Sequence, residues 1–93
     1  MNDIRKAVVS VLGNDQKGII AKVARILYEN DVNIMDISQT ILSGLFSMVM
    51  VVDISSENCD FDRISQALQQ LGEAVGVQIR IQRSEIFDAM HHV

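Results

Sequence analysis

The chain has 93 residues, a formal net charge of −4 and 48% hydrophobic residues, which suits one domain with a modest core. Its acidic balance argues against nucleic-acid binding, because such binding draws affinity from cations that neutralise phosphates. No uncharged apolar run approaches the ~18 residues of a membrane span, and the first residues lack a secretory apolar region. We therefore expect a single soluble, cytoplasmic domain over residues 1–93, with no membrane or nucleic-acid partner.

The first half of the chain predicts a strand, a helix and a hairpin. Residues 4–12 are rich in β-branched side chains and free of turn residues, which predicts a strand. Apolar residues at helical spacing follow over residues 18–30. Two further strands, 33–42 and 45–54, are separated by Ser43-Gly44 alone. A connection this short makes those two strands an antiparallel hairpin.

The second half predicts a helix, a strand and a short terminal helix. Asp60 is placed as an N-cap, and the following apolar residues are three and four apart. These residues are Phe61, Ile64, Leu68, Leu71 and Val75. Gly76 ends that helix, residues 77–82 alternate as a strand, and a last helix covers about residues 84–92. The βαββαβ order of residues 4–83 predicts a ferredoxin-like α+β fold, with a four-stranded antiparallel sheet and two helices on one face.

The third predicted strand is apolar on both faces. One face carries Phe46, Met48, Met50 and Val52, and the other carries Leu45, Val49 and Val51. A strand with one face in water alternates apolar and polar side chains, so this pattern predicts a cover over the second face or the sheet edge. Another copy of the chain is the simplest partner, which predicts a homodimer or a higher homo-oligomer.

A polar loop over residues 13–18 separates the first strand from the first helix. Backbone amides at a helix start and the positive end of the helix dipole can hold a carboxylate without a basic side chain. Gly18 permits a sharp turn and close approach of a ligand, and Asp15 can accept hydrogen bonds from an ammonium group. The candidate ligand-binding residues are Asn14, Asp15, Gln16, Lys17, Gly18, Ile19, Asn33 and Ile34. The alternative is an ordinary tight loop in which Asp15 caps the helix.

Residues 13–23 (GNDQKGIIAKV) are similar to the Asp-Arg-Pro-Gly-type opening of ACT domains, which are small regulatory modules that sense amino acids. Val32-Asn33-Ile34 matches the entry to their second strand, and the resemblance covers about residues 4–83. The chain more closely resembles the stand-alone ACT proteins of bacteria and archaea, which are related to the ACT modules of the glycine-cleavage-system repressor. The tail SEIFDAMHHV resembles the tail of that group.

The resemblance implies a homodimer that acts in metabolic or transcriptional regulation and joins two sheets side by side into one eight-stranded sheet. Back-to-back packing of the two sheets is the alternative, and the sequence does not decide between them. A small amino acid would bind where the loop over residues 13–18 of one subunit meets residues 33–37 of the other. Asp15 and Asn33 match the positions of the two polar contacts in serine-sensing ACT modules. Two positions depart from the family pattern: Lys17 replaces the usual loop proline, and Gly13 stands where the serine sensors carry histidine.

Other functions remain open on weaker patterns. The chain could act as a ligand-free adaptor that binds a metabolic enzyme or regulator through its hairpin or last helix. Asp88, His91 and His92 form a candidate metal site, whose alternative is a solvated helix end. The methionines of the hairpin either fill the core or an interface, or form a surface for a regulated partner. These methionines are Met35, Met48 and Met50.

The sequence contains no set of residues typical of an active site, and no cofactor is expected. Both histidines are terminal, and Cys59 is expected to be a partly buried side chain near a helix start. Acylphosphatases share the βαββαβ order, but they need an arginine in the first loop, where this chain has only Lys17. We therefore expect a protein that is not an enzyme.

Overall fold

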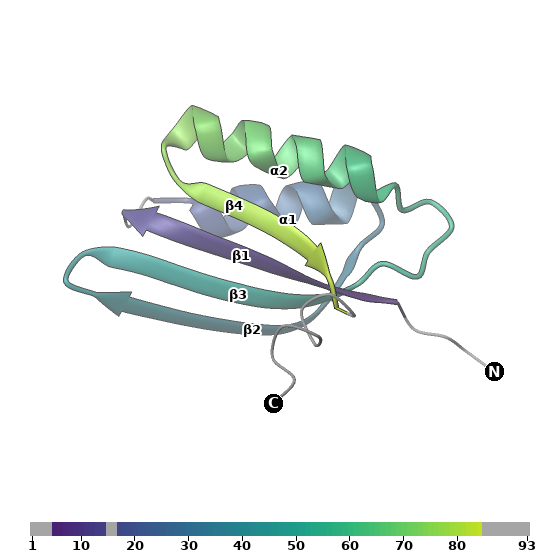
Figure 1. The fold of residues 1–93 in the computed structure, drawn as a ribbon, viewed down its shortest axis with the longest axis horizontal. Coiled ribbons are helices and arrows are strands. Elements are labelled where there is room, and N and C mark those ends of the chain that lie inside the picture. Colours follow the sequence, from purple (N-terminus) through teal and green to yellow (C-terminus); the bar gives the residue numbers. More distant parts are fainter. Residues whose placement is uncertain (1–4, 15–16, 85–93) are drawn as a thin grey trace.

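The computed structural model describes residues 5–14 and 17–84. It confirms the expected βαββαβ order (Figure 1). The elements are β1 (Lys6–Asn14), α1 (Ile19–Glu29), β2 (Asn33–Leu42), β3 (Leu45–Asp53), α2 (Phe61–Val75) and β4 (Gln78–Arg83). The terminal helix expected over residues 84–92 falls outside the described residues, apart from Ser84.

The strands form one antiparallel sheet in the order β2-β3-β1-β4. The core lies between one face of this sheet and the inner faces of α1 and α2, as the ferredoxin-like prediction requires (Figure 1). The predicted inward faces of β1 and β3 are confirmed, because their alternate residues are buried. These residues are Ala7, Val9, Val11, Phe46, Met48, Met50 and Val52.

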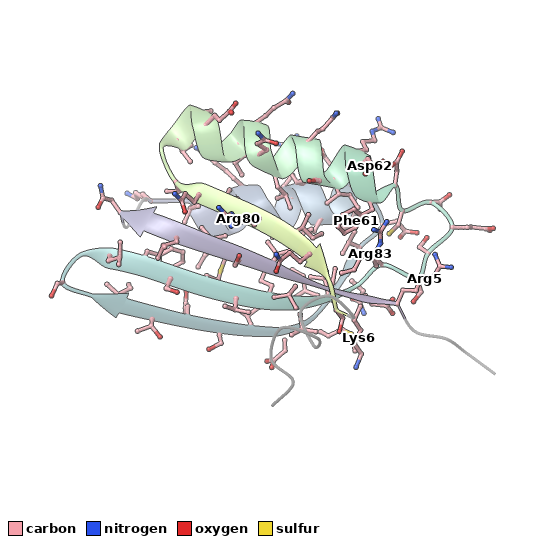
Figure 2. The ribbon with its side chains drawn as sticks, in the orientation of Figure 1. Arg5, Lys6, Phe61, Asp62, Arg80 and Arg83 are labelled. Atoms are coloured by element: carbon pink, nitrogen blue, oxygen red, sulfur yellow. The ribbon has the colours of Figure 1, made fainter. Side chains whose placement is uncertain are left out.

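α2 begins and ends on the residues that its sequence indicates, and α1 lies within the predicted range 18–30. The Asp60 side chain caps α2 by accepting a hydrogen bond from the Arg63 N–H at 3.2 Å. Gly76 ends α2 in the left-handed conformation, with φ of 77°. At the far end of β4, the Arg83 guanidinium lies 4.2 Å from the centroid of the Phe61 ring, so it ties the end of the strand to the start of α2 (Figure 2).

The hairpin turn is a two-residue type I′ turn, because Ser43 and Gly44 both have positive φ, at 53° and 82°. It places Leu42 opposite Leu45 and so sets the register of β2 on β3. A β-bulge between Ile34 and Asp36 shifts this register near the start of β2. The sequence pattern did not predict this bulge.

β2 extends beyond the cover of the helices (Figure 1). Ile37 and Ile41 lie opposite Met50 and Phe46, so they face the helix side of the sheet. Their relative exposures are nevertheless 44% and 58%. Met35 is also exposed, so the expected methionine group is divided: Met48 and Met50 fill the core and Met35 lies on the surface.

The second face of the sheet is partly apolar, as the pattern of the third strand predicted. Leu12, Leu45 and Val49 are exposed there, and Val51 is half-buried. Neither helix covers this face, because α1 and α2 pack on the opposite one (Figure 1). Within residues 5–14 and 17–84, this face and the edge of β2 are therefore apolar surfaces that α1 and α2 do not bury.

β1 is longer at its C-terminal end than the sequence predicted. It runs through Gly13 and Asn14, which pair with Phe46 and Leu45 of β3. Gly13 faces the core side, where an added Cβ would lie 2.6 Å from the Cγ1 atom of Val77. This contact leaves no room for a side chain at position 13.

We predict that Gly13→Ala lowers the free energy of unfolding by about 1–3 kcal/mol, because the new methyl group overpacks the contact with Val77. Urea denaturation followed by circular dichroism measures the change. Ser10→Ala is the matched control in the same strand, on the opposite face, and is expected to change stability by less than about 0.5 kcal/mol. Equal stability of Gly13→Ala and the parent chain would contradict the packing argument.

Candidate ligand site

The loop half of the candidate site lies at the C-terminal end of β1. Asn14 is the last residue of the strand rather than a loop residue, and its side chain is exposed. Lys17 and Gly18 are exposed, whereas Ile19 is the first residue of α1 and is buried. Asp15 and Gln16 lie outside the described residues. The loop half therefore presents polar groups and one cation at the start of α1.

Gly18 is the N-cap of α1, with φ of 81°. It has no side chain with which to cap the helix, and its carbonyl accepts the first helical hydrogen bond from the Lys22 N–H at 3.0 Å. The first-turn amides of any helix lack partners within that helix. Among the residues that the structure describes, none places an atom within 4 Å of a Cβ added at Gly18. A helix start of this kind suits a small anionic group.

The strand half of the candidate site is the start of β2. Asn33 is exposed and Ile34 is half-buried. Just before β2 the chain turns at Asp31, whose φ is positive at 60°. The Asp31 carboxylate accepts hydrogen bonds from the Ser56 hydroxyl and from the Asn58 side-chain amide, the latter at 3.4 Å. These bonds attach the start of β2 to the loop between β3 and α2.

Cys59 strengthens the same attachment. Its thiol lies 3.4 Å from the backbone carbonyls of Asn30 and Asp31, within hydrogen-bond distance for sulfur. Burial raises the pKa of Cys59, and the nearby Asp31 charge raises it further. A raised pKa leaves little reactive thiolate, so the side chain is a poor nucleophile. The expected partly buried position near a helix start is confirmed.

Sequence reasoning missed the contacts of Asp31, although Asn30-Asp31 and the polar stretch before Asp60 both mark turns.

The two halves of the candidate site lie at opposite ends of the sheet. Asn14 is level with Leu45 on β3, whereas Asn33 is level with Asp53. Eight residues of strand separate these two levels, which is about 27 Å at a rise of ~3.4 Å per residue. One chain therefore cannot form the candidate site by itself.

Position 13 also bears on the kind of ligand. Val77 fills the space on the core side of this position, so a histidine would not fit there without displacing Val77, the residue before β4. This contact gives a steric reason for Gly13 where the serine-sensing modules have histidine. Lys17 lies beyond the end of β1 and is exposed, so the loop carries a cation at the position of the usual proline.

Other features of the described residues lie away from this site. A shallow groove of about 450 Å³ runs between α2 and β4, lined by Ser65, Gln69, Glu73 and residues 77–82. Among residues 5–14 and 17–84, no three His, Cys, Asp or Glu side chains form a group that could hold a metal ion. The metal candidates Asp88, His91 and His92 lie outside that part of the chain. Within the same residues, no helix has the length and apolar character needed to span a bilayer.

Comparison with known proteins places this chain in one family. A protein from Methanocaldococcus jannaschii of the UPF0237 group is 47% identical over 88 residues, which cover 95% of this chain and 98% of that protein. An ACT domain protein from Streptococcus pneumoniae superimposes with a TM-score of 0.78 at 36% identity, covering 92% of this chain and 97% of that one. A structure described as a glycine cleavage system transcriptional repressor shares the fold, with a TM-score of 0.74 at 24% identity. The match covers 86% of this chain and 46% of that one.

The family model of the ACT domain matches residues 5–82, nearly all of the described chain. ACT domains are regulatory modules that often bind amino acids. The chain is therefore a member of the ACT domain family.

Proposed function

We propose that the protein is a homodimeric regulatory module that binds a small amino acid at its subunit interface, in metabolic or transcriptional regulation in the cytoplasm. The ligand contacts the loop over residues 13–18 of one subunit and residues 33–37 of the other. A free, half-buried Cys59 accords with a reducing compartment.

The observation that carries this proposal is the separation of the two halves of the site within one chain. β2 is an edge strand, and among the strands that the structure describes none pairs with its outer edge. If two β2 strands pair antiparallel, the end of one lies beside the start of the other. This pairing brings the loop of one subunit and Asn33 of the other to the same end of an eight-stranded sheet.

The side chains of the β2 edge support such pairing. Edge strands that remain in water are commonly protected by charged side chains or proline. Residues 37–42 of β2 contain neither, and Ile37 and Ile41 are exposed on the helix side. β4, the other edge strand, is different: Arg80 and Arg83 are exposed along it (Figure 2). β2 is therefore the better candidate for the subunit interface.

The ligand chemistry follows from the groups that meet at this interface. The amides at the start of α1 receive the carboxylate of the amino acid, assisted by the helix dipole. Asp15 accepts hydrogen bonds from its ammonium group, and Asn33 of the partner subunit offers a donor and an acceptor. Lys17 adds a positive charge beside the carboxylate. Because the ligand contacts both subunits, its binding is linked to dimerisation and to whatever the dimer binds.

A ligand-free adaptor is the second candidate function. The exposed apolar residues Ile41 and Leu45 at the tip of the hairpin favour it, because such residues suit a protein partner. Calorimetric titration with the common amino acids separates the two functions. Binding at micromolar to millimolar concentration supports the regulatory module, whereas silence across the whole set supports the adaptor.

We predict that Asp15→Ala weakens amino-acid binding by about 1–3 kcal/mol, the cost of losing a charge-assisted hydrogen bond. Calorimetry gives the affinity, and thermal unfolding gives the stability of the same variant. Asp62→Ala, an exposed aspartate on α2, is the control and keeps the parent affinity. If Asp15→Ala loses about 1 kcal/mol of stability as a lost cap and keeps its affinity, the loop is structural.

We also predict that the double substitution Ile37→Lys and Ile41→Lys converts the dimer to monomers. Lysines on both sides of the interface bring like charges together and remove apolar contacts. Sedimentation velocity measures the mass, and the expected monomer is 10.4 kDa. Gln78→Lys, on the other edge strand, is the control and stays dimeric. A dimer that survives the double substitution would show that another surface joins the subunits.

A further inference from the structure

We propose a specific register for the subunit interface: two β2 strands pair antiparallel about a two-fold axis at Gln39. Ile37 then lies opposite Ile41 of the partner subunit, and Gln39 lies opposite the partner's Gln39. This inference rests on the proposed homodimer and states which residues meet in it.

The hairpin determines which backbone groups are available at the edge. In a two-residue type I′ hairpin, the residues that close the turn exchange both of their backbone hydrogen bonds. Leu42 and Leu45 are those residues here. The backbone N–H and C=O groups of every second residue from Leu42 back to Asp36 therefore point toward β3. The residues between them, Ile37, Gln39 and Ile41, point theirs toward the free edge.

When two copies of a strand pair about a two-fold axis, the numbers of the two paired residues add to the same value at every position, and this sum defines the register. Only the odd-numbered residues of this segment present their backbone groups outward, so the possible sums differ by two. A sum of 78 pairs Ile37 with Ile41 of the partner subunit and uses all three outward residues. A sum of 76 or 80 places Gln39 opposite an isoleucine and leaves one outward residue without a counterpart within residues 37–41.

The side-chain pattern selects the same register. The edge row on the helix side reads Ile37, Gln39, Ile41, which is symmetric about its centre. A symmetric row is self-complementary under a two-fold axis. It puts the exposed isoleucines against each other and lets the two glutamine amides hydrogen-bond.

The other face of the sheet agrees with this register. Ser38 and Thr40 lie opposite Val49 and Ser47 of β3, so they are on the face away from the helices. A sum of 78 pairs Ser38 with Thr40 of the partner subunit, a hydroxyl pair of the kind that stabilises antiparallel strands. The carboxylate of Asp36 is kept away from that of the partner's Asp36.

The regular part of the edge has the length that this register needs. The bulge at Ile34/Asp36 ends it on one side, and the turn at Ser43 ends it on the other. The midpoint of residues 36–42 is Gln39. The loop of one subunit and Asn33 of the partner subunit then lie at one end of the joined sheet. In this register Asn14 is level with Asp36 of the partner subunit, two ladder positions or about 7 Å along the strand from the partner's Asn33, compared with about 27 Å along the strands within one chain. Across the sheet, three strand spacings of about 14 Å in total separate β1 from the partner's β2.

Disulfide cross-linking of single-cysteine variants tests this register directly. Cys59→Ser removes the native thiol, and one cysteine is then placed in turn at Ile37, Ser38, Gln39, Thr40 and Ile41. Residues that meet at the two-fold axis have Cα atoms about 5.5 Å apart, within the range for a disulfide. Thr40 lies diagonally to its own copy, at about 7–8 Å, and Ile41 lies farther from its copy. Copper–phenanthroline oxidation and non-reducing electrophoresis measure the cross-linked dimer, and thermal unfolding checks that each variant is folded.

We expect Gln39→Cys to form disulfide-linked dimer at least tenfold faster than the cysteines at the other four positions. The double variant Ile37→Cys with Ile41→Cys is expected to cross-link although neither single variant does. A maximum at Ser38 or Thr40 would overturn the register, and no cross-linking at any position in a folded dimer would overturn pairing through β2. Calorimetric silence with amino acids, together with a maximum at Gln39, would support this register while contradicting the ligand proposal.

Discussion

The structure depends on one constraint: a single apolar layer must be buried between one face of a four-stranded sheet and two helices. Val9, Val11, Met48 and Met50 are fully or almost fully buried in that layer, where they meet Val23, Leu27, Ile64 and Leu68 of the helices. Burial of such side chains is the main stabilising term for a small domain. Two helices do not cover the whole width of the sheet, so β2 is left with exposed isoleucines (Figure 1). The apolar edge is therefore a consequence of how the core is built.

The turns place functional groups at the two ends of this sheet. Gly18 at the start of α1, Asp31 before β2 and Ser43-Gly44 in the hairpin all have positive φ, which turns the chain sharply. Gly18 gives α1 no side-chain cap, whereas Asp31 is held by Ser56 and Asn58. The start of β2 is thus fixed by side-chain hydrogen bonds.

Close packing explains one departure from the family pattern. Gly13 contacts Val77, the residue that follows the C-cap of α2, and Gly72 lies near the Val77 carbonyl. Gly13 and Gly72 therefore leave room for Val77 in the connection between α2 and β4. A larger side chain at position 13 would disturb this corner. The fold therefore accounts for the glycine at this position.

The sequence by itself determined the element order, the inward faces of β1 and β3, the caps of α2 and the two-residue hairpin. Each follows from local rules: strand alternation, helical spacing, or the conformations that Asp60, Gly76 and Ser43-Gly44 favour. Only the tertiary structure decided that Asn14 belongs to β1, that a bulge interrupts β2 beside Met35, and that Gly13 packs on Val77. It alone placed the loop residues and Asn33 at opposite ends of the sheet. These features depend on strand order and register, which arise from contacts between residues far apart in the chain and leave no periodic pattern in the sequence.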